Sequence, residues 1–222
     1  MKGQRKLIFI VAAIAAILLA TGLVNRKLTQ SLEEAYGVEY KYYDMGEVVP
    51  FEEDYQTYGV SLLDGYSMRI DKAEVMTTEE FFAWTGYTDQ SVAALLGENI
   101  QWLPEKLCVL TVTFFNEDCD AQGFYLDNFS CNNDTYAMNF DSTLTVLAND
   151  FLMNANETDI SSGFVGNVGN WLGHDEEVTL YMVYDYIKFY FDDVHWENLT
   201  EDTLQFMVTW FPTEKLVNMV LE

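Results

Sequence analysis

The sequence predicts a mainly β protein, an antiparallel β-sandwich with a few short helices, preceded by one N-terminal transmembrane helix. Residues 7–24, LIFIVAAIAAILLATGLV, carry no charge, and a helix needs roughly 17–25 apolar residues to cross a bilayer. From residue 66 onward, several stretches alternate apolar and polar residues, which is the period of a half-buried strand. Turn-forming residues separate these stretches, as in an antiparallel sandwich.

The apolar run at residues 7–24 favours an uncleaved membrane anchor. The apolar core of a secretory signal is shorter, roughly 7–15 residues, and Leu18 interrupts the small-residue pattern that would place cleavage after Ala20. A cleaved signal is the alternative, and it would make the protein secreted. Basic residues before the run slightly favour an N-terminus in the cytoplasm. We therefore expect a single-pass protein of the cell membrane whose domain lies outside the cytoplasm.

The chain is expected to have three parts. Residues 1–27 form a short cytoplasmic tail and the anchor, residues 28–45 form a juxtamembrane segment, and residues 46–222 form the extracellular β-sandwich. The last part has the size of one ordinary domain.

The charge of the chain is strongly asymmetric. From residue 28 onward there are six basic residues and all 36 acidic residues, a net charge of −30. Such a surface repels phosphate backbones, which argues against nucleic-acid binding. It attracts a cation or a basic partner, although solubility alone also accounts for a high net charge.

The alternation of apolar and polar residues predicts the individual strands. They are expected at residues 66–76, 106–115, 123–131, 135–140, 142–148, 177–184, 203–210 and 216–222. The phase of the first changes at Ala73, as a β-bulge would produce.

Side-chain faces follow from the same period. In the second strand, one face is expected to carry Cys108, Leu110, Val112 and Phe114. In the strand at 203–210, one face is expected to carry Leu204, Phe206, Val208 and Trp210. Residues 211–215, FPTEK, are expected to form a turn.

The clearest helix signal lies at TTEEFFAWTG. Thr77 and Glu80 have the spacing of a capping box, Met76 and Phe81 occupy hydrophobic-staple positions, and Gly86 ends the helix. Further short helices are expected at residues 31–34 and 91–97.

An acidic loop offers a candidate calcium site. Asn116, Asp118 and Asp120 occupy positions 1, 3 and 5 of a calcium-loop spacing, and Asp127 falls at position 12. Oxygen ligands converging from a tight loop suit Ca²⁺. However, position 6 is Ala121 where such loops have glycine, so an acidic hairpin turn is the alternative. No other cofactor is indicated.

The three cysteines have different expected roles. Cys108 alternates with core residues, which predicts a buried free thiol. Cys119 and Cys131 could form a disulfide in an external compartment. An odd number of cysteines does not by itself indicate a disulfide framework, so this pairing stays open.

No catalytic residue is predicted. The chain has two histidines, His174 and His195, which flank different loops without metal or triad spacing. Asp192 and Asp193 are adjacent in sequence, which is no indication of a catalytic pair.

Several tyrosines precede the predicted sandwich and could form a binding platform for carbohydrate or peptide, with packing as the alternative. They are Tyr36, Tyr40, Tyr42, Tyr43 and Tyr55.

An ordered series of segments carries a family resemblance. The segments are MGEVV after an aromatic stretch, DGYSMRIDKAEVMTTEEFF, VLTVTFFNEDCDAQGF, LGHDEEVTLYMVYD and FMVTWFPTEKLVNMVLE. Together they resemble the telokin-like, immunoglobulin-like extracellular domains of unknown function from Gram-positive bacteria, over roughly residues 38–222. The resemblance implies an external immunoglobulin-like sandwich without assigned catalysis. The chain lacks the lipobox of the lipoprotein members.

These observations favour a membrane-anchored, extracytoplasmic β-sandwich that binds or scaffolds and does not catalyse. Its expected partners are the membrane, through the N-terminal helix, and another envelope protein or a cation. The alternatives are a cell-envelope hydrolase with an unrecognised site and a calcium-stabilised surface domain.

Overall fold

A computed structural model describes residues 37–55, 63–88, 103–119, 124–133, 136–149, 169–170 and 172–222. The chain divides into two compact units, Met1–Glu39 and Tyr40–Glu222. Among the described residues, no helix is both long and apolar enough to cross a membrane. The predicted anchor at residues 7–24 and the predicted helices at 31–34 and 91–97 lie outside these ranges.

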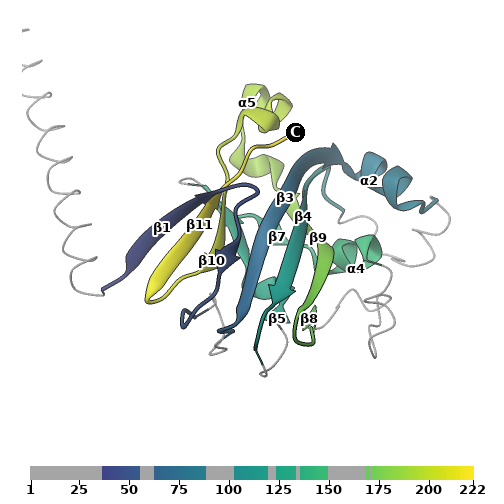
Figure 1. The fold of residues 1–222 in the computed structure, drawn as a ribbon. Coiled ribbons are helices and arrows are strands. Elements are labelled where there is room, and N and C mark those ends of the chain that lie inside the picture. The colour runs from purple at the N-terminus through teal and green to yellow at the C-terminus, as the bar shows by residue number, and fades with distance from the viewer. Residues whose placement is uncertain are drawn as a thin grey trace, which may run out of the picture. The chain divides into compact units, whose positions relative to one another are not determined.

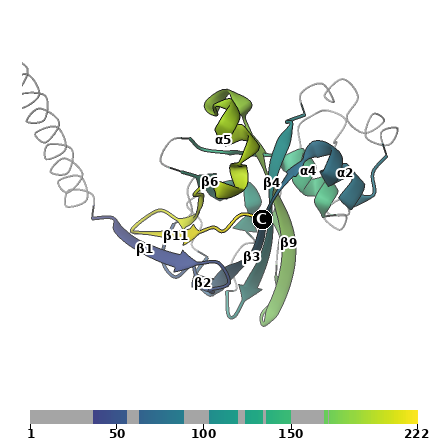
Figure 2. The same cartoon turned by 90° about the horizontal axis from the view of Figure 1, so that it is seen from above.

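The second unit is mainly β, as predicted, and has two main sheets (Figures 1 and 2). The four-stranded sheet has the order β1 (Glu39–Asp44), β11 (Thr213–Asn218), β10 (Gln205–Thr209) and β6 (Ser130–Asn132). The five-stranded sheet has the order β2 (Val49–Pro50), β3 (Tyr66–Thr77), β4 (Lys106–Asn116), β9 (Glu176–Tyr186) and β7 (Asn139–Phe140). A small third sheet pairs β5 (Phe124–Tyr125) with β8 (Gly169–Asn170). Strand β1 falls within the segment expected to be juxtamembrane.

The helices are short. They are α2 (Thr78–Thr85), α4 (Ser142–Ala148), α5 (Asp193–Glu197) and the 3₁₀ turns η2 (Leu126–Asn128), η5 (Lys188–Tyr190) and η6 (Leu199–Glu201). Both views place α2 and α4 side by side against the five-stranded sheet (Figures 1 and 2).

Three long antiparallel strands form the centre of the five-stranded sheet. Tyr66 of β3 pairs with Asn116 of β4, which pairs with Glu176 of β9. The register of β3 shifts between Ile70 and Lys72, which confirms the predicted bulge. Because the strands are antiparallel and in register, the start of β3, the end of β4 and the start of β9 lie at the same end of the sheet.

The core lies between the inner faces of the two main sheets. The predicted inward face of β4 is confirmed, because Cys108, Leu110, Val112 and Phe114 are all fully buried. Rings connect the sheets: Tyr184 of β9 meets Phe206 of β10 edge-on, with a centroid distance of 6.3 Å. Fully burying a large apolar side chain contributes about 1.5–3 kcal/mol, so this face is a substantial source of stability.

Helix α2 begins and ends where the sequence predicts. Thr77 accepts a hydrogen bond from the Glu80 amide, and the Glu80 carboxylate accepts one from the Thr77 amide. Gly86 ends the helix in the left-handed conformation, with φ of 80°. Phe81 is fully buried beneath the helix.

The prediction of a strand at residues 142–148 is wrong, because this segment is the helix α4. Asp141 caps it by accepting a hydrogen bond from the Leu144 amide. Side chains of this helix and of Asn149 provide hydrogen-bond partners for the backbone of β9 beyond the short strand β7. The Asn149 side chain bonds both the amide and the carbonyl of Tyr181, and Thr145 Oγ1 accepts from the Val183 amide. Side chains here replace a neighbouring strand, which a strand-like sequence pattern does not reveal.

The end of the chain also differs from the prediction. Strand β10 ends at Thr209 after a register shift, so Trp210 is 47% exposed instead of sharing the buried face. The predicted turn at 211–215 is shorter, since β11 begins at Thr213. The chain ends against β3, where the backbone of Glu222 bonds Ala73 and Val75.

Lys215 of β11 has no exposed surface. Its ammonium donates to the carbonyls of Pro50 and Phe51 at 2.7 and 3.2 Å, and to Glu52 Oε2 at 2.6 Å. It also forms an ion pair with Asp54 Oδ2 at 2.7 Å. A single cation therefore fixes the segment that follows β2 against the last strand.

Asp54 completes this connection. It is 5% exposed, and its Oδ1 accepts a hydrogen bond from the Thr213 amide at 3.0 Å. Removing one partner of a buried ion pair leaves the other charge uncompensated, which costs more than the intact pair contributes.

We predict that Lys215→Met lowers the free energy of unfolding by about 3–5 kcal/mol, because the Asp54 carboxylate remains buried without its cation. Urea denaturation of the two variants Lys215→Met and Lys215→Met/Asp54→Asn measures this. Asparagine keeps an acceptor for the Thr213 amide but carries no charge, so the double variant should be the more stable. If the double variant is as unstable as the single one, the charge is not the cause.

Candidate functional site

A pocket lies at the end of the five-stranded sheet where β3 and β9 begin and β4 ends. Its volume is about 250 Å³. Its lining residues are Val48, Ser67, Phe115, Asn116, Glu117, Asp175, Glu176 and Glu177. Residues that are far apart in the sequence meet here because the antiparallel register aligns these strand ends.

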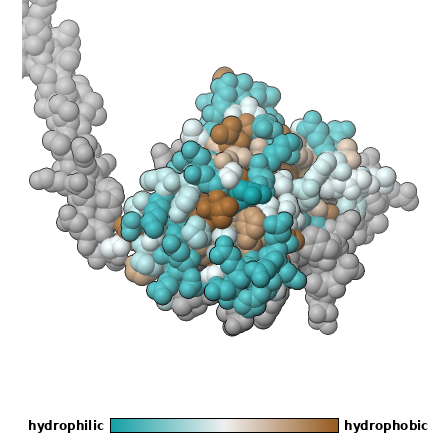
Figure 3. All heavy atoms as spheres, in the orientation of Figure 1, coloured by the Kyte–Doolittle hydropathy of each residue, from teal (hydrophilic) through white to brown (hydrophobic). Residues whose placement is uncertain are grey.

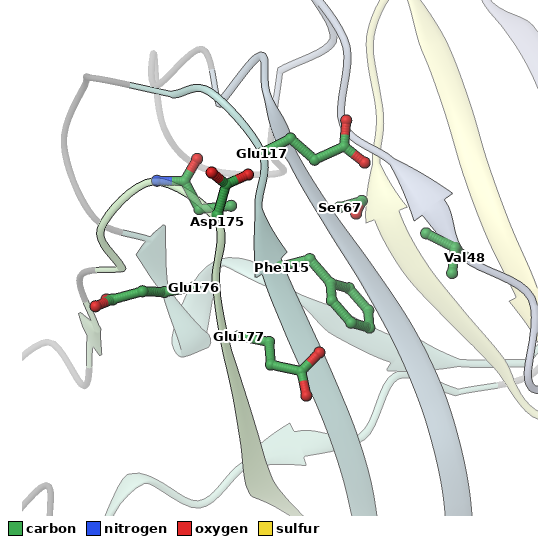
Figure 4. A pocket seen from close by; sticks show the side chains of 8 residues that line it. Val48, Ser67, Phe115, Glu117, Asp175, Glu176 and Glu177 are labelled. Carbon is green, nitrogen blue, oxygen red and sulfur yellow. The ribbon is translucent and has the colours of Figure 1, made fainter.

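The pocket combines an apolar floor with carboxylates (Figure 4). Val48 is 49% exposed, and the Phe115 ring lies between it and β9. Glu177 lies on the same side of β9 as Phe115, whereas Glu176 points to the other side, as successive residues of a strand do. The Glu176 carboxylate instead accepts a hydrogen bond from the Gly173 amide at 2.7 Å.

The acidic character extends beyond this pocket. An adjoining pocket shares Val48, Ser67 and Glu117, and its further acidic lining residues are Glu52, Asp64 and Asp118. In the described part of the chain, neither lining contains a lysine, arginine or histidine. Arg69 lies over the Phe115 ring at 5.4 Å, but its charge is paired with Asp71 at 2.5 Å.

The domain has few cations to neutralise this end. Each of its six basic residues forms an ion pair with a carboxylate; they are Lys41, Arg69, Lys72, Lys106, Lys188 and Lys215. Figure 3 shows hydrophilic side chains over most of the described surface on one face. The carboxylates at the pocket are therefore in large excess, and their field favours positively charged ligands.

Local hydrogen bonds hold the rim of the pocket. The Asn116 side chain is buried, accepts from the Cys119 amide and donates to the carbonyls of Cys119 and Leu172. Tyr66 O–H donates to the same Leu172 carbonyl, and burial raises the pKa of Tyr66.

Gly65 permits the close approach of this rim. Its φ is +91°, and a Cβ at this position would lie 2.6 Å from Asp118 Oδ1 and 2.7 Å from the Cys119 amide nitrogen. Only glycine combines this conformation with this contact.

The calcium candidate is not brought together in the described residues. The Asn116 side chain hydrogen-bonds the backbone of Cys119, and Asp118 between them in the sequence is exposed. Asp127 lies in the turn η2, and Asp120 lies outside the described residues. Within the part of the chain that the structure describes, no three His, Cys, Asp or Glu residues are grouped to hold a metal. The calcium site stays a prediction.

All three cysteines are buried free thiols in this structure, which confirms the prediction for Cys108. The disulfide that the sequence left open between Cys119 and Cys131 is not formed. Cys119 is held at the acidic rim by Asn116, whereas Cys131 lies on β6 and its thiol donates to Met138 Sδ at 3.4 Å. The two belong to different parts of the fold.

Neither histidine is among the described lining residues of the acidic pocket, although His174 directly precedes the lining residue Asp175. His174 is exposed in the loop before β9. His195 Nε2 is 3.5 Å from Asp202 Oδ1, whose side chain is only 6% exposed. Asp202 also accepts hydrogen bonds from Tyr136 O–H and Asn133.

A third pocket, of about 520 Å³, borders this pair. It is lined by Asn133, His195, Asp202, Thr203, Leu204, Gln205, Asn218 and Met219. Burial, followed by the bond to Asp202, raises the pKa of Tyr136, so this tyrosine is a donor at neutral pH. Among the described residues that line it, Thr203 is the single hydroxyl and there is no thiol.

The remaining sequence candidates have structural positions. Asp192 caps α5 by accepting from the His195 amide, and Asp193 lies in the first turn of that helix. Tyr40 and Tyr42 are exposed on β1, whereas Tyr43 packs against the core. Tyr55 pairs with Phe211, and Tyr36 lies outside the described residues.

Asp185 on β9 is a mostly buried carboxyl whose pKa is raised. Burial, followed by the charge of Asp141, raises the pKa of Asp185 to about 7, and its Oδ1 is buried without a hydrogen-bond partner. Burial also raises the pKa of Asp141. A folded pKa above the unfolded value of about 4 means that protonation favours the folded state, and this contribution is lost as the pH rises through about 7.

We predict that Asp185→Asn raises the free energy of unfolding at pH 8 by about 1–2 kcal/mol, allowing for partial solvent screening, and changes it little at pH 4. Urea denaturation from pH 4 to pH 8 measures this. The exposed Glu53→Gln variant is the control and should follow the wild-type pH dependence. A gain for Asp185→Asn that is equal at both pH values would contradict the assigned ionisation.

The fold and the site define a mainly β domain with two main sheets and an acidic pocket at the aligned ends of three antiparallel strands. The chain belongs to the family described as Domain of unknown function (DUF5028), which it matches over residues 40–215. No curated protein matches the chain, and no solved structure matches it.

Proposed function

We propose that this protein is a non-catalytic binding domain whose acidic pocket receives a basic segment of a partner protein. The observation that carries the proposal is the pocket itself, in which Val48 and Phe115 lie among the carboxylates of Glu117, Asp175 and Glu177. A lysine or arginine side chain has an apolar stem and a charged head. Such a side chain would cover the apolar floor while its charge meets the carboxylates.

The proposed setting is the outer face of a cell membrane. The domain is proposed to be an immunoglobulin-like sandwich of a bacterial surface protein, tethered by residues 7–24, and the partner is proposed to be another envelope protein. The uncharged N-terminal run, the sequence resemblance and two packed β-sheets support this setting. An acidic domain is also repelled by anionic lipid headgroups, which favours a partner away from the bilayer surface.

A hydrolase is the alternative, and His195 beside the buried Asp202 is the observation that favours it. A histidine–carboxylate pair can act as a general base. The neighbouring lining offers Thr203 as its hydroxyl. The acidic pocket needs no such chemistry, and its charge and shape suit binding better.

Binding of a labelled peptide of about eight lysines by the purified chain tests the proposed pocket. We predict that the triple variant Glu117→Gln/Asp175→Asn/Glu177→Gln weakens binding at least about tenfold at physiological salt, where exposed charges act over only about 8 Å. Asparagine suits the left-handed conformation of Asp175, whose φ is 57°.

The matched control is Glu79→Gln/Asp193→Asn/Glu201→Gln, which removes the same charge from exposed positions on α2, α5 and η6. These elements follow the opposite ends of β3 and β9. The control should change the dissociation constant less than about threefold, because its charges lie beyond the screening distance. Equal losses in both triple variants, or no binding by the wild type, would refute a specific pocket.

Protease treatment of intact host cells tests the setting. We predict that the domain is removed from whole cells while an N-terminal fragment remains in the membrane fraction, as detected by antibodies to each end. A cytoplasmic protein of the same cells, which must stay intact, is the control. Full protection of the domain until lysis would place it inside the cell.

A further inference from the structure

Two buried cysteines lie on opposite sheets. Cys108 is on β4 of the five-stranded sheet and Cys131 is on β6 of the four-stranded sheet, and neither side chain is exposed. Both are free thiols in this structure.

Strand register places these thiols opposite each other. Cys131 pairs directly with Phe206 of β10, and Cys108 pairs directly with Tyr184 of β9. Directly paired residues present their side chains on the same face of a sheet. Because the rings of Phe206 and Tyr184 meet across the core at 6.3 Å, the two cysteines face each other beside this contact. In agreement, burial and then the adjacent Cys108 thiol raise the pKa of Cys131.

The surroundings do not suit a reactive thiolate. A reactive cysteine lies next to a cation or a helix N-terminus and is partly exposed, whereas Cys131 is buried with its thiol directed at Met138 Sδ. Two facing thiols without an activating group have one further reaction available, their oxidation to a disulfide. Cys119 is excluded from this pair because Asn116 holds it at the acidic end of the sheet.

We propose that Cys108 and Cys131 form a disulfide that joins the two sheets when the chain folds in the presence of a disulfide oxidant, and that Cys119 stays a free thiol. In the reaction, the two thiols lose two hydrogens and one S–S bond forms. A disulfide such as oxidised glutathione accepts the two electrons and two protons and becomes two thiols. Exchange takes place during folding, before the core closes over Cys108 and Cys131.

The bond would close a loop from residue 108 to residue 131. Such a closure restricts the unfolded chain and so favours the folded state. It would add a covalent link where the Cys131 carbonyl already accepts a hydrogen bond from the Met138 amide and Tyr184 O–H donates to the Phe129 carbonyl.

Oxidative refolding of the full chain in mild detergent tests the proposal. The denatured, reduced chain is refolded with reduced and oxidised glutathione and then alkylated in denaturant. We expect one alkylated cysteine per chain, three after reduction, and a proteolytic peptide that links Cys108 to Cys131. The oxidised chain should melt about 5 °C higher than the reduced chain.

Two variants make the result specific. Cys119→Ser should keep the linked peptide and the higher melting temperature, whereas Cys131→Ser should lose both. Three alkylated thiols in the refolded wild type, or a linked peptide that contains Cys119, would overturn the proposal. Because the experiment uses the purified chain and no binding partner, its outcome is independent of the proposed pocket.

Discussion

The buried ammonium of Lys215 is the interaction on which the arrangement of this domain depends. It joins the segment after β2 to the final strand, which are separated by almost the whole domain in sequence. Phe51, whose carbonyl accepts a hydrogen bond from this lysine, is fully buried. The centroid of its ring lies 5.9 Å from that of Phe129. Removing two charges from water offsets much of their attraction. The contribution of the pair is therefore best understood as fixing which segments meet, while apolar burial supplies the stability.

The contacts of Lys215 also position residues at the acidic end of the five-stranded sheet. Glu52 contacts Lys215 and also lines the pocket that adjoins the proposed binding site. Val48 and Pro50, which precede this segment in the sequence, also line the adjoining pocket. The buried ammonium of Lys215 therefore holds the segment that carries Glu52 at the adjoining pocket. Lys215 pairs with both Asp54 and Glu52, and Lys41 adds a second cation at 3.9 Å from Glu52. These two carboxylates are therefore balanced, and the remaining ones are free to act outward.

The long strands were predictable because apolar residues recur at every second position of β4 and β9, although positions on both faces of each strand are buried in the structure. The capping box at Thr77 specifies a helix start through local hydrogen bonds. Residues 142–148 were mispredicted because their apolar content suits either a strand or a helix, and the decisive contacts are to the distant edge of β9. Trp210 was misplaced because a register shift ended the alternation one residue earlier.

The candidate site was not predictable to the same extent. Its carboxylates belong to two acidic runs, at residues 117–118 and 175–177, which the sequence presents as separate turns. The available signal for their proximity was their position, because one run follows a predicted strand and the other precedes one. Only the pairing of Asn116 with Glu176 brings them together. The proximity of Cys108 to Cys131 was not predicted for a related reason, because residues that meet across two sheets have no characteristic spacing in the sequence.

The cost of this arrangement supports a functional interpretation. Carboxylates gathered at one end of a sheet repel each other and oppose the compact state. Dispersing them over the surface would keep the domain equally soluble, so solubility does not account for the clustering at Glu117, Asp175 and Glu177. Places where a fold departs from its most stable choice are where functional sites are expected. The apolar floor among these carboxylates is a second departure from the most stable arrangement, because the exposed side chain of Val48 would be more favourable if it were buried. A basic side chain that covers this floor relieves both costs at once.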